Sequence, residues 1–562
     1  MIFTGKHNEK DPQTMNINTF THYPRLLTIL LPFALLTACG GGTNSTPTNP
    51  SDNTGPTWEQ GTFEPSENFA AQCENPRIGN SPITGVAYPD KSGSELIEKH
   101  WQRAFTNETY LWYKEVIDKD PKNYSLFDYF DQLKTNELTP SGTPKDNFHF
   151  SQDTAEYNEL SQSGISSGFG FDWEFGSNTV PRELTVRFTE PGSPAAAANV
   201  PRGAKVVSIN GVDFVNDNTQ QGVNALNDGL FPDDAGTTTS FQFELIDGTT
   251  MSVDITSADI NVTPVQNVKV FDTENGKTGY FQFNTFIVTA QEGLIEAFDT
   301  FVEENVTELV MDLRYNGGGR LALASQLSYM VAGPNQTNDA TFETLRFNDK
   351  NPTTNPVTGQ SISPTPFYST VIDYNEGLLT NTLLPSLSLT RVYVISTDAT
   401  CSASEAVMNA LRGIDVEVVQ IGSTTCGKPY GFYPTDNCGE TYFTIQFQGV
   451  NNKGFGDYAD GFMPTATPNF DFELPGCEVE DDFTTSLGEP EEGMLAATLE
   501  YAATGSCPVV VSGNGIADVK ALRSDQSGLV GETLIPIDTP NTRRDNFVLQ
   551  NKINQPIIQE RK

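Results

Sequence analysis

The stretch DATCSASEAV, residues 398–407, stands where a predicted strand gives way to a predicted helix. The preceding RVYVIS (391–396) is rich in β-branched and aromatic residues, which favours a strand. Apolar residues then recur at the spacing of one buried helical face, at Ala403, Ala406, Val407, Ala410 and Leu411. Two serines, Ser402 and Ser404, occupy this corner. They are explained either by helix capping, because a serine hydroxyl can satisfy a first-turn N–H, or by a nucleophile on a helix N-terminus.

Strands and helices alternate on both sides of this corner. The predicted strands are TGYFQF (278–283), ELVMDLR (308–314), EVVQIG (417–422) and YFTIQF (442–447), and the predicted helices are QEGLIEAFDTFVEE (291–304), LALASQLSYMVA (321–332) and EGMLAATLEYAAT (492–504). This order predicts an α/β fold with an open, largely parallel sheet, in which sites gather at the carboxyl ends of strands. Both DLRYNGGG (312–319) and ATCSAS (399–404) fall at such ends.

The net charge of the chain limits the classes of partner that it can bind. Among 562 residues, 72 are acidic and 33 are basic, which gives a formal net charge of −39. Such a surface repels nucleic acid and anionic membranes, so we expect no nucleic-acid partner. The acidic residues form no long block, which indicates a solvated surface rather than an interaction tail.

The N-terminus is typical of an exported protein. LLTILLPFALL (26–36) follows Arg25 and is too short to span a bilayer, but it suits the apolar region of a signal peptide. LTAC ends at Cys39 and resembles a bacterial lipobox, which implies cleavage before Cys39 and lipidation of its thiol. A plain secretory signal is the alternative. The resemblance places the protein in the cell envelope, and Gly40 after the cysteine favours the outer membrane, facing the periplasm or the cell surface.

Six cysteines follow Cys39, and an even number in an oxidising compartment favours disulfides over a metal site. No CxxC pair occurs and histidine is scarce, so we expect neither a metal nor another cofactor. Cys426 and Cys438 flank an eleven-residue segment that a bridge could close as a hairpin, and Cys477 with Cys507 is a plausible second pair.

The predicted secondary structure before residue 278 differs between two regions. Residues 67–154 have helical spacing and many aromatic residues, whereas 155–265 are predicted to contain short strands and turns. Two stretches in the second part, SSGFGFDW (166–173) and PGSPAAAANVPRGAKVVSINGVDF (191–214), resemble a PDZ domain. That resemblance implies a loop whose backbone N–H groups bind a peptide C-terminal carboxylate, with the peptide added as an edge strand. The implied peptide-binding residues are Gly168, Phe169, Gly170 and Phe171. An ordinary glycine-bearing strand is the alternative explanation.

A serine nucleophile needs a base, and the histidines offer none in a suitable context. His7 and His22 go with the signal segment, while His100 and His149 lie in the N-terminal helical region. A lysine can serve when burial lowers its pKa towards the working pH. The candidate is Lys428 in STTCGKPYGF (423–432), a glycine-bearing turn after a predicted strand. A solvent-facing loop lysine is the plain alternative.

DLRYNGGG, TCSASEAVMNAL and IGSTTCGKPYG, in this order behind a PDZ-like segment, resemble the C-terminal processing (tail-specific) peptidases over roughly residues 95–475. That family consists of serine peptidases with a Ser-Lys dyad. The resemblance implies Ser402 as nucleophile and Lys428 as base, with oxyanion donors at Ala403 and at Gly317 or Gly318. Backbone donors at a helix N-terminus suit charge that develops on a carbonyl oxygen. It also implies protein substrates with apolar, poorly structured C-termini.

Two features depart from the family pattern. Many relatives have a glutamine four residues after the lysine, where this chain has Phe432. Cys401 adjoins the proposed nucleophile, and Cys426 precedes the lysine by two residues, so a disulfide at either would stiffen the site. Phe432 also supports a second hypothesis, a PDZ-containing binding lipoprotein whose catalytic core has lapsed. A hydrolase of small esters or glycans would leave the PDZ-like domain without a task.

The sequence therefore predicts six segments. They are a signal peptide (1–38), a lipidated tether (39–66), an N-terminal helical region (67–154), a PDZ-like domain (155–265), a protease core (266–510) and a poorly ordered C-terminal tail (511–562). We expect a lipid-anchored serine endopeptidase that reaches the membrane through this anchor. Glu405, in the first turn of the helix, is expected to be structural through its favourable interaction with the helix dipole.

Overall fold

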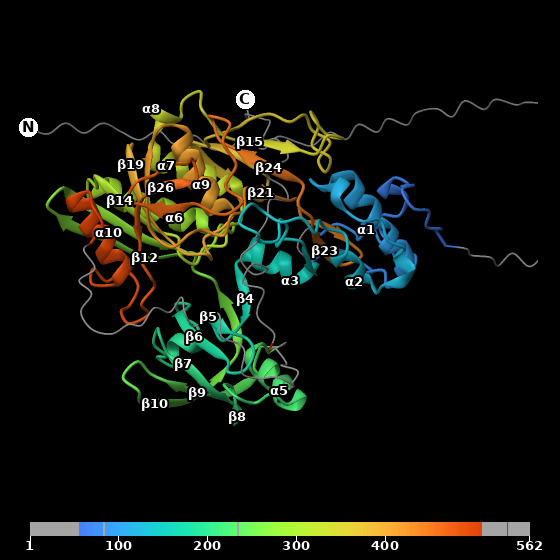
Figure 1. Ribbon diagram of the computed structural model, residues 1–562, viewed down its shortest axis with the longest axis horizontal. Coiled ribbons are helices and arrows are strands. Elements are labelled where there is room, and N and C mark those ends of the chain that lie inside the picture. Colours follow the sequence, from blue (N-terminus) through green and yellow to red (C-terminus); the bar gives the residue numbers. More distant parts are fainter. Residues whose placement is uncertain (1–54, 83–84, 233–234, 509–536, 538–562) are drawn as a thin grey trace, which may run out of the picture. The chain divides into compact units, whose positions relative to one another are not determined.

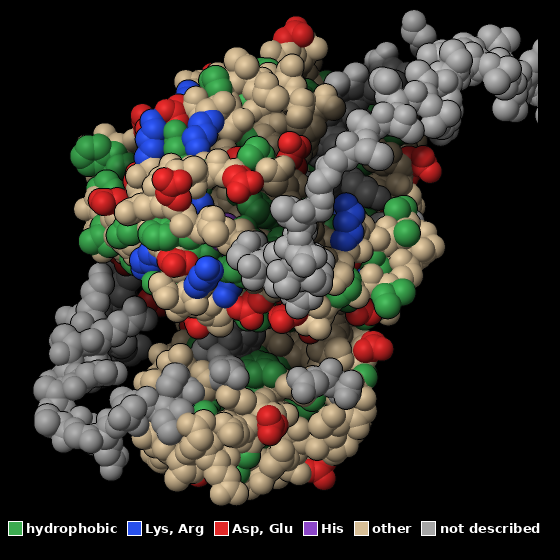
Figure 2. Space-filling view, turned by 90° about the vertical axis from the view of Figure 1, so that its right-hand side faces the viewer, with side chains coloured by type: hydrophobic (Ala, Val, Ile, Leu, Met, Phe, Trp, Pro, Cys, Tyr) green, Lys and Arg blue, Asp and Glu red, His purple; other side chains and the backbone are tan. Residues whose placement is uncertain are grey.

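The structure, a computed structural model, describes residues 55–82, 85–232, 235–508 and Ile537 (Figure 1). The predicted signal peptide, the lipidation site Cys39 and the C-terminal tail apart from Ile537 lie outside these described residues. Within them, no helix combines the length and the apolar character needed to cross a bilayer. On the face in Figure 2, acidic side chains are scattered over the surface rather than gathered in one block.

The largest sheet of the structure has seven strands in the order β12-β13-β14-β19-β20-β26-β25 and lies in the part of the chain predicted as the protease core. Only the β12–β13 pair is antiparallel, so the predicted open and largely parallel sheet is confirmed. The strands are β12 (Val265–Thr273), β13 (Gly276–Phe283), β14 (Glu308–Asp312), β19 (Arg391–Ser396), β20 (Glu417–Gly422), β25 (Met463–Thr465) and β26 (Glu473–Glu478).

Helices cover both faces of this sheet because successive strand residues point to opposite sides. The helices α6 (Ala290–Glu303), α7 (Leu321–Ala332) and α9 (Ala403–Gly413) share one apolar cluster with Leu309, Met311 and Val394. The intervening residues, including Val310 and Ile395, pack on the other face against α10 (Gly493–Thr504).

The PDZ-like domain is a six-stranded sheet in the order β10-β9-β7-β6-β5, with β8 paired to β7. The Asn210-Gly211 turn joins β7 to β8, and both residues have the positive φ that such a two-residue turn requires. Ile537 lies in the core of this domain and donates its N–H to the carbonyl oxygen of Asn178. The elements are β4 (Ile165–Gly168), β5 (Phe171–Ser177), β6 (Glu183–Thr189), α4 (Pro194–Ala197), β7 (Lys205–Ile209), β8 (Val212–Asp213), α5 (Gln220–Leu230), β9 (Thr238–Glu244), β10 (Thr250–Thr256) and β11 (Ala258–Asn261).

The N-terminal region joins the core through strand pairing and a disulfide. Its strand β3 pairs with β23, and Cys73 is bonded to Cys438 beside that strand. Its elements are η1 (Ser66–Asn68), β1 (Gln72–Cys73), β2 (Lys91–Ser92), α1 (Glu95–Thr109), η2 (Tyr113–Glu115), η3 (Pro121–Asn123), α2 (Leu126–Asp131), β3 (Phe150–Asp153), α3 (Thr154–Asn158) and η4 (Glu159–Ser163). The helix α1 ends at Thr109, because Tyr110 adopts extended backbone.

The predicted strand at 442–447 is split between two small sheets outside the main one. Its first two residues belong to β23, which pairs with β22 and β3, and its last residue begins β24, which pairs with β15 and β21. The remaining elements are α8 (Pro334–Thr337), β15 (Thr341–Phe347), β16 (Thr365–Pro366), β17 (Thr370–Asp373), β18 (Leu378–Leu383), β21 (Tyr430–Gly431), β22 (Thr435–Asn437), β23 (Glu440–Phe443) and β24 (Phe447–Val450).

The same split explains why the prediction of a Cys426–Cys438 bridge is wrong. The segment between these cysteines forms no closed hairpin, because β21 pairs with β24 whereas β22 pairs with β23. Cys426 is instead bonded to Cys401, while the predicted pair of Cys477 with Cys507 is confirmed.

Candidate active site

The site is assembled from loops that follow three adjacent parallel strands. Gly317, Gly318 and Gly319 follow β14, Ser402 follows β19, and Lys428 follows β20. Since the carboxyl ends of neighbouring parallel strands meet at one edge of the sheet, three distant segments of the chain come together there. This is the arrangement that the sequence predicts for 312–319 and 399–404.

Ser402 sits on a strained turn immediately before α9. Its φ of 56° and ψ of −111° lie in a region that side chains other than glycine rarely adopt. The glycine run passes close beside it, because a Cβ built on Gly318 would lie 2.8 Å from the Ser402 Cβ and 2.9 Å from the Ala403 nitrogen. Gly318 itself has a φ of +107°, so a residue with a side chain there would be both strained and crowded.

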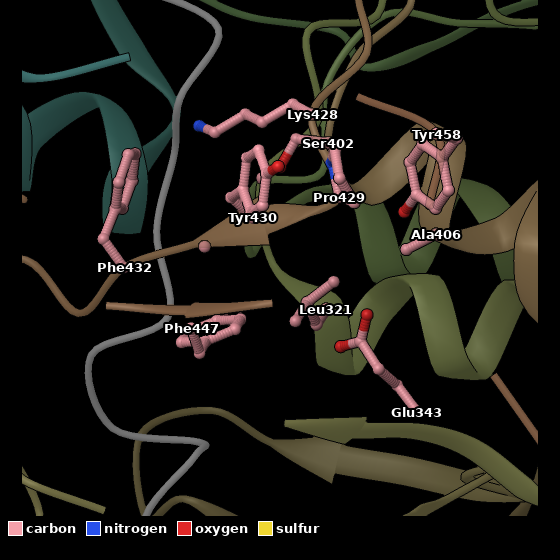
Figure 3. Close-up of a pocket in the computed structure, with 12 residues that line it drawn as sticks. Leu321, Glu343, Ser402, Ala406, Lys428, Pro429, Tyr430, Phe432, Phe447 and Tyr458 are labelled. Atoms are coloured by element: carbon pink, nitrogen blue, oxygen red, sulfur yellow. The ribbon is translucent and has the colours of Figure 1, made fainter. Parts of the chain in front are cut away.

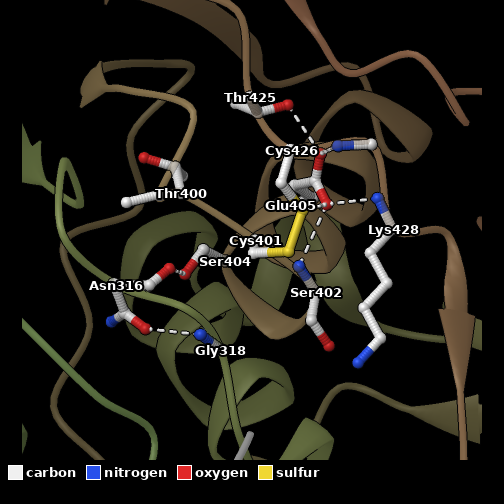
Figure 4. The surroundings of a disulfide bond; sticks show 12 residues. Asn316, Gly318, Thr400, Cys401, Ser402, Ser404, Glu405, Thr425, Cys426 and Lys428 are labelled. Atoms are coloured by element: carbon white, nitrogen blue, oxygen red, sulfur yellow. Dashed lines mark hydrogen bonds between the residues drawn. A yellow bond between two sulfur atoms is a disulfide. The ribbon is translucent and has the colours of Figure 1, made fainter. Parts of the chain in front are cut away.

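Asn316 holds the glycine run against the serine turn (Figure 4). Its side-chain oxygen accepts the Gly318 N–H at 2.9 Å, and its carbonyl oxygen accepts the Cys401 N–H at 3.0 Å and the Ser404 hydroxyl at 2.9 Å. The Ser404 hydroxyl is therefore used in a structural hydrogen bond. Sequence reasoning missed Asn316, although a polar residue directly before a glycine run was a visible signal.

The predicted oxyanion donors differ in what they contact. The Gly318 N–H points to Asn316, so it would have to leave that oxygen to reach a substrate. The N–H groups of Ala403 and Gly317 make no hydrogen bond within the described part of the chain. Ala403, as the first residue of α9, carries one of the N–H groups that a helix cannot pair internally.

Glu405 connects the serine turn to the lysine turn and does more than favour the helix dipole. Its carboxylate is fully buried, and one oxygen accepts the N–H groups of Ser402 at 3.0 Å and Lys428 at 2.8 Å. The other oxygen accepts the Thr425 hydroxyl at 2.6 Å and the Gly427 N–H at 2.9 Å. Burial raises the pKa of Glu405, and these four hydrogen bonds oppose that rise. Figure 4 shows the carboxylate between the two turns.

A disulfide joins the same two turns. Cys401 and Cys426 are bonded with their Cα atoms 5.2 Å apart, and the Cys426 N–H donates to the carbonyl oxygen of Thr400 at 3.0 Å. One covalent bond therefore links the turn that carries Ser402 to the turn that carries Lys428. The sequence analysis considered a disulfide at either cysteine but did not pair the two with each other.

Lys428 is buried, with 2% of its surface exposed. Its Nζ lies 4.0 Å from the centre of the Phe432 ring and 5.0 Å from that of Phe148. Phe432, at the position of the glutamine in many relatives, thus contacts the amine with an aromatic face, a cation–π geometry. The plain alternative of a solvent-facing lysine does not fit this burial.

Ser402 and Lys428 line one small cavity of about 20 Å³ (Figure 3). Most of its walls are apolar or aromatic. The lining residues are Gly319, Leu321, Glu343, Ser402, Ala406, Lys428, Pro429, Tyr430, Gly431, Phe432, Phe447 and Tyr458.

The other candidate residues lie elsewhere. Gly168, Phe169, Gly170 and Phe171 form the loop between β4 and β5 in the PDZ-like domain, and β5 is the edge strand of its sheet. Phe169 is buried in the core of that domain and Phe171 is half-buried against it. A Cβ on Gly170 would lie 2.2 Å from the Ser193 Cβ, so close packing alone requires glycine there.

Neither His100 nor His149 lines the cavity. His149 is buried in the N-terminal region, where a ring nitrogen contacts the carbonyl oxygen of Phe130 at 2.9 Å, and His100 lies on α1. Burial lowers the pKa of both. Among the described residues that line the cavity, Lys428 is therefore the basic side chain.

Known proteins carry the same domain. The model of peptidase family S41 matches residues 277–435. A carboxyl-terminal-processing protease from Picosynechococcus sp. is 27% identical over 172 residues, which are 30% of this chain and 39% of that protein. The matched part thus spans about two fifths of that relative.

One solved structure shows the fold. A crystal structure assigned to the S41 proteases, from Bacteroides fragilis, covers 75% of this chain and 98% of its own, with 22% identity and a TM-score of 0.53. The PDZ domain of a carboxy-terminal protease from Vibrio cholerae, solved with a peptide, covers 17% of this chain and 99% of its own, with 16% identity and a TM-score of 0.14. Residues 277–435 of the chain therefore match peptidase family S41, and part of the chain is similar in sequence to a carboxyl-terminal-processing protease.

Proposed function

We propose that the protein is a serine endopeptidase with a Ser402-Lys428 dyad that cleaves proteins captured by their C-terminal tails. One observation carries this proposal. A buried lysine and a strained serine line the same cavity, on turns that a disulfide and a shared carboxylate hold together. A positioned nucleophile and base are what acyl transfer requires.

In the proposed reaction the Ser402 hydroxyl attacks the scissile carbonyl carbon while its proton passes to the Lys428 amine. Burial supports this role because desolvation disfavours the ammonium form of a lysine. The N–H groups of Ala403 and Gly317 would hold the oxyanion, joined by Gly318 if it leaves Asn316. When the carbon–nitrogen bond breaks, the lysine returns the proton to the leaving amine. Water then attacks the acyl-enzyme while Lys428 accepts its proton, and Lys428 returns that proton to the Ser402 oxygen as the ester bond breaks and the carboxylic product leaves.

The PDZ-like domain would supply the substrates. Among the described strands β5 pairs on one side only, so an added peptide strand would pair with its other side, and the junction Gly168–Phe171 leads from β4 into β5. A peptide bound mainly through its backbone places little demand on sequence, so apolar, poorly structured tails are the proposed partners. No cofactor enters this reaction.

We propose further that lipidation of Cys39 anchors the protein in the cell envelope, facing the periplasm or cell surface. This part rests on the sequence alone. Incorporation of labelled palmitate into the wild type but not into Cys39→Ser would support it, and equal labelling would refute it.

The decisive test compares a soluble form from Gly40 onward with its Ser402→Ala and Lys428→Ala variants on an unfolded substrate with an apolar C-terminus. Lys453→Ala is the matched control, because Lys453 is exposed and pairs only with surface Asp415 and a helix-end carbonyl. Loss of cleavage in both dyad variants, with the control active, is the expected result. Cleavage by Ser402→Ala would exclude that nucleophile. A wild type that binds tails without cutting them would favour the lapsed, scaffold-type protein.

A further inference from the structure

A carboxyl group that the proposed reaction does not use faces the cavity beside the nucleophile. Glu343, on β15, has 7% of its surface exposed and lines the cavity with Ser402 and Lys428. Figure 3 shows its carboxylate directed towards Leu321 and Ala406. Neither carboxylate oxygen hydrogen-bonds to any described residue, in contrast to Glu405, whose oxygens take four hydrogen bonds.

The fold makes room for this carboxyl group. A Cβ built on Gly449 of the neighbouring strand β24 would lie 1.8 Å from a Glu343 oxygen, so a side chain at residue 449 would displace this carboxyl group. Tyr458, 2% exposed, is a second polar residue in the lining, and its hydroxyl makes no hydrogen bond within the described residues. Figure 3 shows this hydroxyl on the side of Ala406.

An unpaired buried carboxyl group is unfavourable unless a ligand completes its hydrogen bonds. An apolar pocket with a few convergent polar groups is the usual form of a specificity site. The cavity lies at the first turn of α9, next to Ser402, so the substrate side chain that enters it is that of the residue whose carbonyl is attacked, the P1 residue. Its size, about 20 Å³, is near that of one water, which excludes long basic side chains.

We propose that Glu343, together with Tyr458, forms the polar base of the P1 pocket and selects a small hydroxyl side chain, serine or threonine. Glu343 is a specificity-determining residue in this proposal and takes no part in the bond-making steps. The inference rests on the proposed function, because a P1 residue exists only if the protein cleaves peptides.

The test is the P1 profile of wild type, Glu343→Gln and Glu343→Leu on a peptide library, read by mass spectrometry. The wild type should prefer serine or threonine over alanine and valine by at least about tenfold, since a site built to hydrogen-bond a hydroxyl rejects analogues that lack it. Glu343→Gln, which keeps hydrogen-bonding capacity, should retain the preference. Glu343→Leu should remain active and prefer alanine or valine.

Glu190→Gln is the matched control. Glu190 is likewise a glutamate whose pKa burial raises, to about 7. It lies in the PDZ-like domain, where its carboxylate accepts the Thr263 N–H. Its substitution should leave the P1 profile unchanged. An active Glu343→Leu enzyme with the wild-type profile would overturn the proposal, as would a wild type that prefers apolar P1 residues.

A second measurement does not depend on cleavage. If the Glu343 carboxyl group is unpaired, Glu343→Leu should raise the melting temperature, whereas a fall would show that the protein itself satisfies this group and would overturn the proposal. If Glu343→Leu raises the melting temperature but no form of the protein cleaves the peptides, the proposed function is refuted. The conclusion that the Glu343 carboxyl group is unpaired would still hold. Cleavage that Ser402→Ala abolishes would establish the function before the profile is judged.

Discussion

Replacing Glu405 with glutamine tests whether its carboxylate positions both members of the proposed dyad. The side chain accepts four hydrogen bonds from the serine and lysine turns, and glutamine has one oxygen in place of two. The amide NH₂ will face Thr425 and Gly427, because the Thr425 hydroxyl can turn from donor to acceptor. The Gly427 N–H then loses its acceptor inside the protein.

The expected loss of stability follows from the Gly427 N–H that is left without an acceptor. A buried donor without an acceptor costs about 1–3 kcal/mol, so Glu405→Gln should lower the unfolding free energy by about 2 kcal/mol. The Gly427–Lys428 turn should shift with it. If most of this free energy is lost from the aligned site, kcat falls about tenfold to thirtyfold, at about 1.4 kcal/mol per factor of ten. Since Glu405 does not line the cavity, KM should stay within about twofold of the wild type.

The assay combines urea unfolding with steady-state proteolysis. Glu417→Gln is the matched control, because Glu417 pairs with Arg391 at an exposed position. It should change stability by less than about 0.5 kcal/mol. A Glu405→Gln enzyme with wild-type stability and kcat would refute the reasoning, since it would mean that one oxygen serves all four donors or that the carboxyl group is already protonated.

Two further perturbations test other parts of the site. Replacing Cys401 and Cys426 by alanine should abolish proteolysis, whereas the same change at Cys477 and Cys507 should spare it. The sequence separations of 25 and 30 are similar, so both variants should lose about 3 kcal/mol in urea unfolding, and equal activities would contradict a positioning role for the first bridge. Secondly, burial raises the pKa of Glu343 from 4.5 to about 8, in a cavity whose other titratable groups are Lys428, Tyr430 and Tyr458. The folded state then binds the extra proton, so its stability relative to Glu343→Leu should fall as the pH rises from 4.5 to 8, and urea unfolding that shows a pH-independent difference would contradict this.

The sequence predicts the succession of strands and helices along the chain, because each core element has a clear hydrophobic periodicity. RVYVIS and EVVQIG are strands over their full predicted lengths, and 321–332 is a helix over its full predicted length. Apolar runs bounded by turn residues leave little choice in such elements. The strand predicted at 442–447 shows the limit, because periodicity reveals that a segment is extended but not which sheet it joins.

Within the candidate site, the sequence proposes the reacting residues but does not predict the contacts that hold them. Ser402, Lys428 and the glycine run lie in motifs, so a resemblance finds them. Glu405 and Asn316 act through hydrogen bonds to backbone groups of another loop, and nothing in the local sequence says where that loop lies. The partner of Cys426 was mispredicted for the same reason, since the nearer cysteine along the chain was not the nearer one in space.

The contacts that the sequence did not predict all fix the backbone of the two turns. They explain how the proposed dyad can be held in position with Phe432 in place of the glutamine. A side-chain amide can orient a lysine amine directly, whereas here the backbone of Lys428 is fixed from behind by Glu405 and by the bridge at Cys426. Aromatic rings enclose the amine in front. The fixed backbone and the surrounding aromatic rings leave the Lys428 side chain few rotamers. The position of its amine can therefore be set without a hydrogen bond from residue 432. Restoring glutamine there should therefore add little to kcat in the oxidised protein, and should help most when the Cys401–Cys426 bridge is absent.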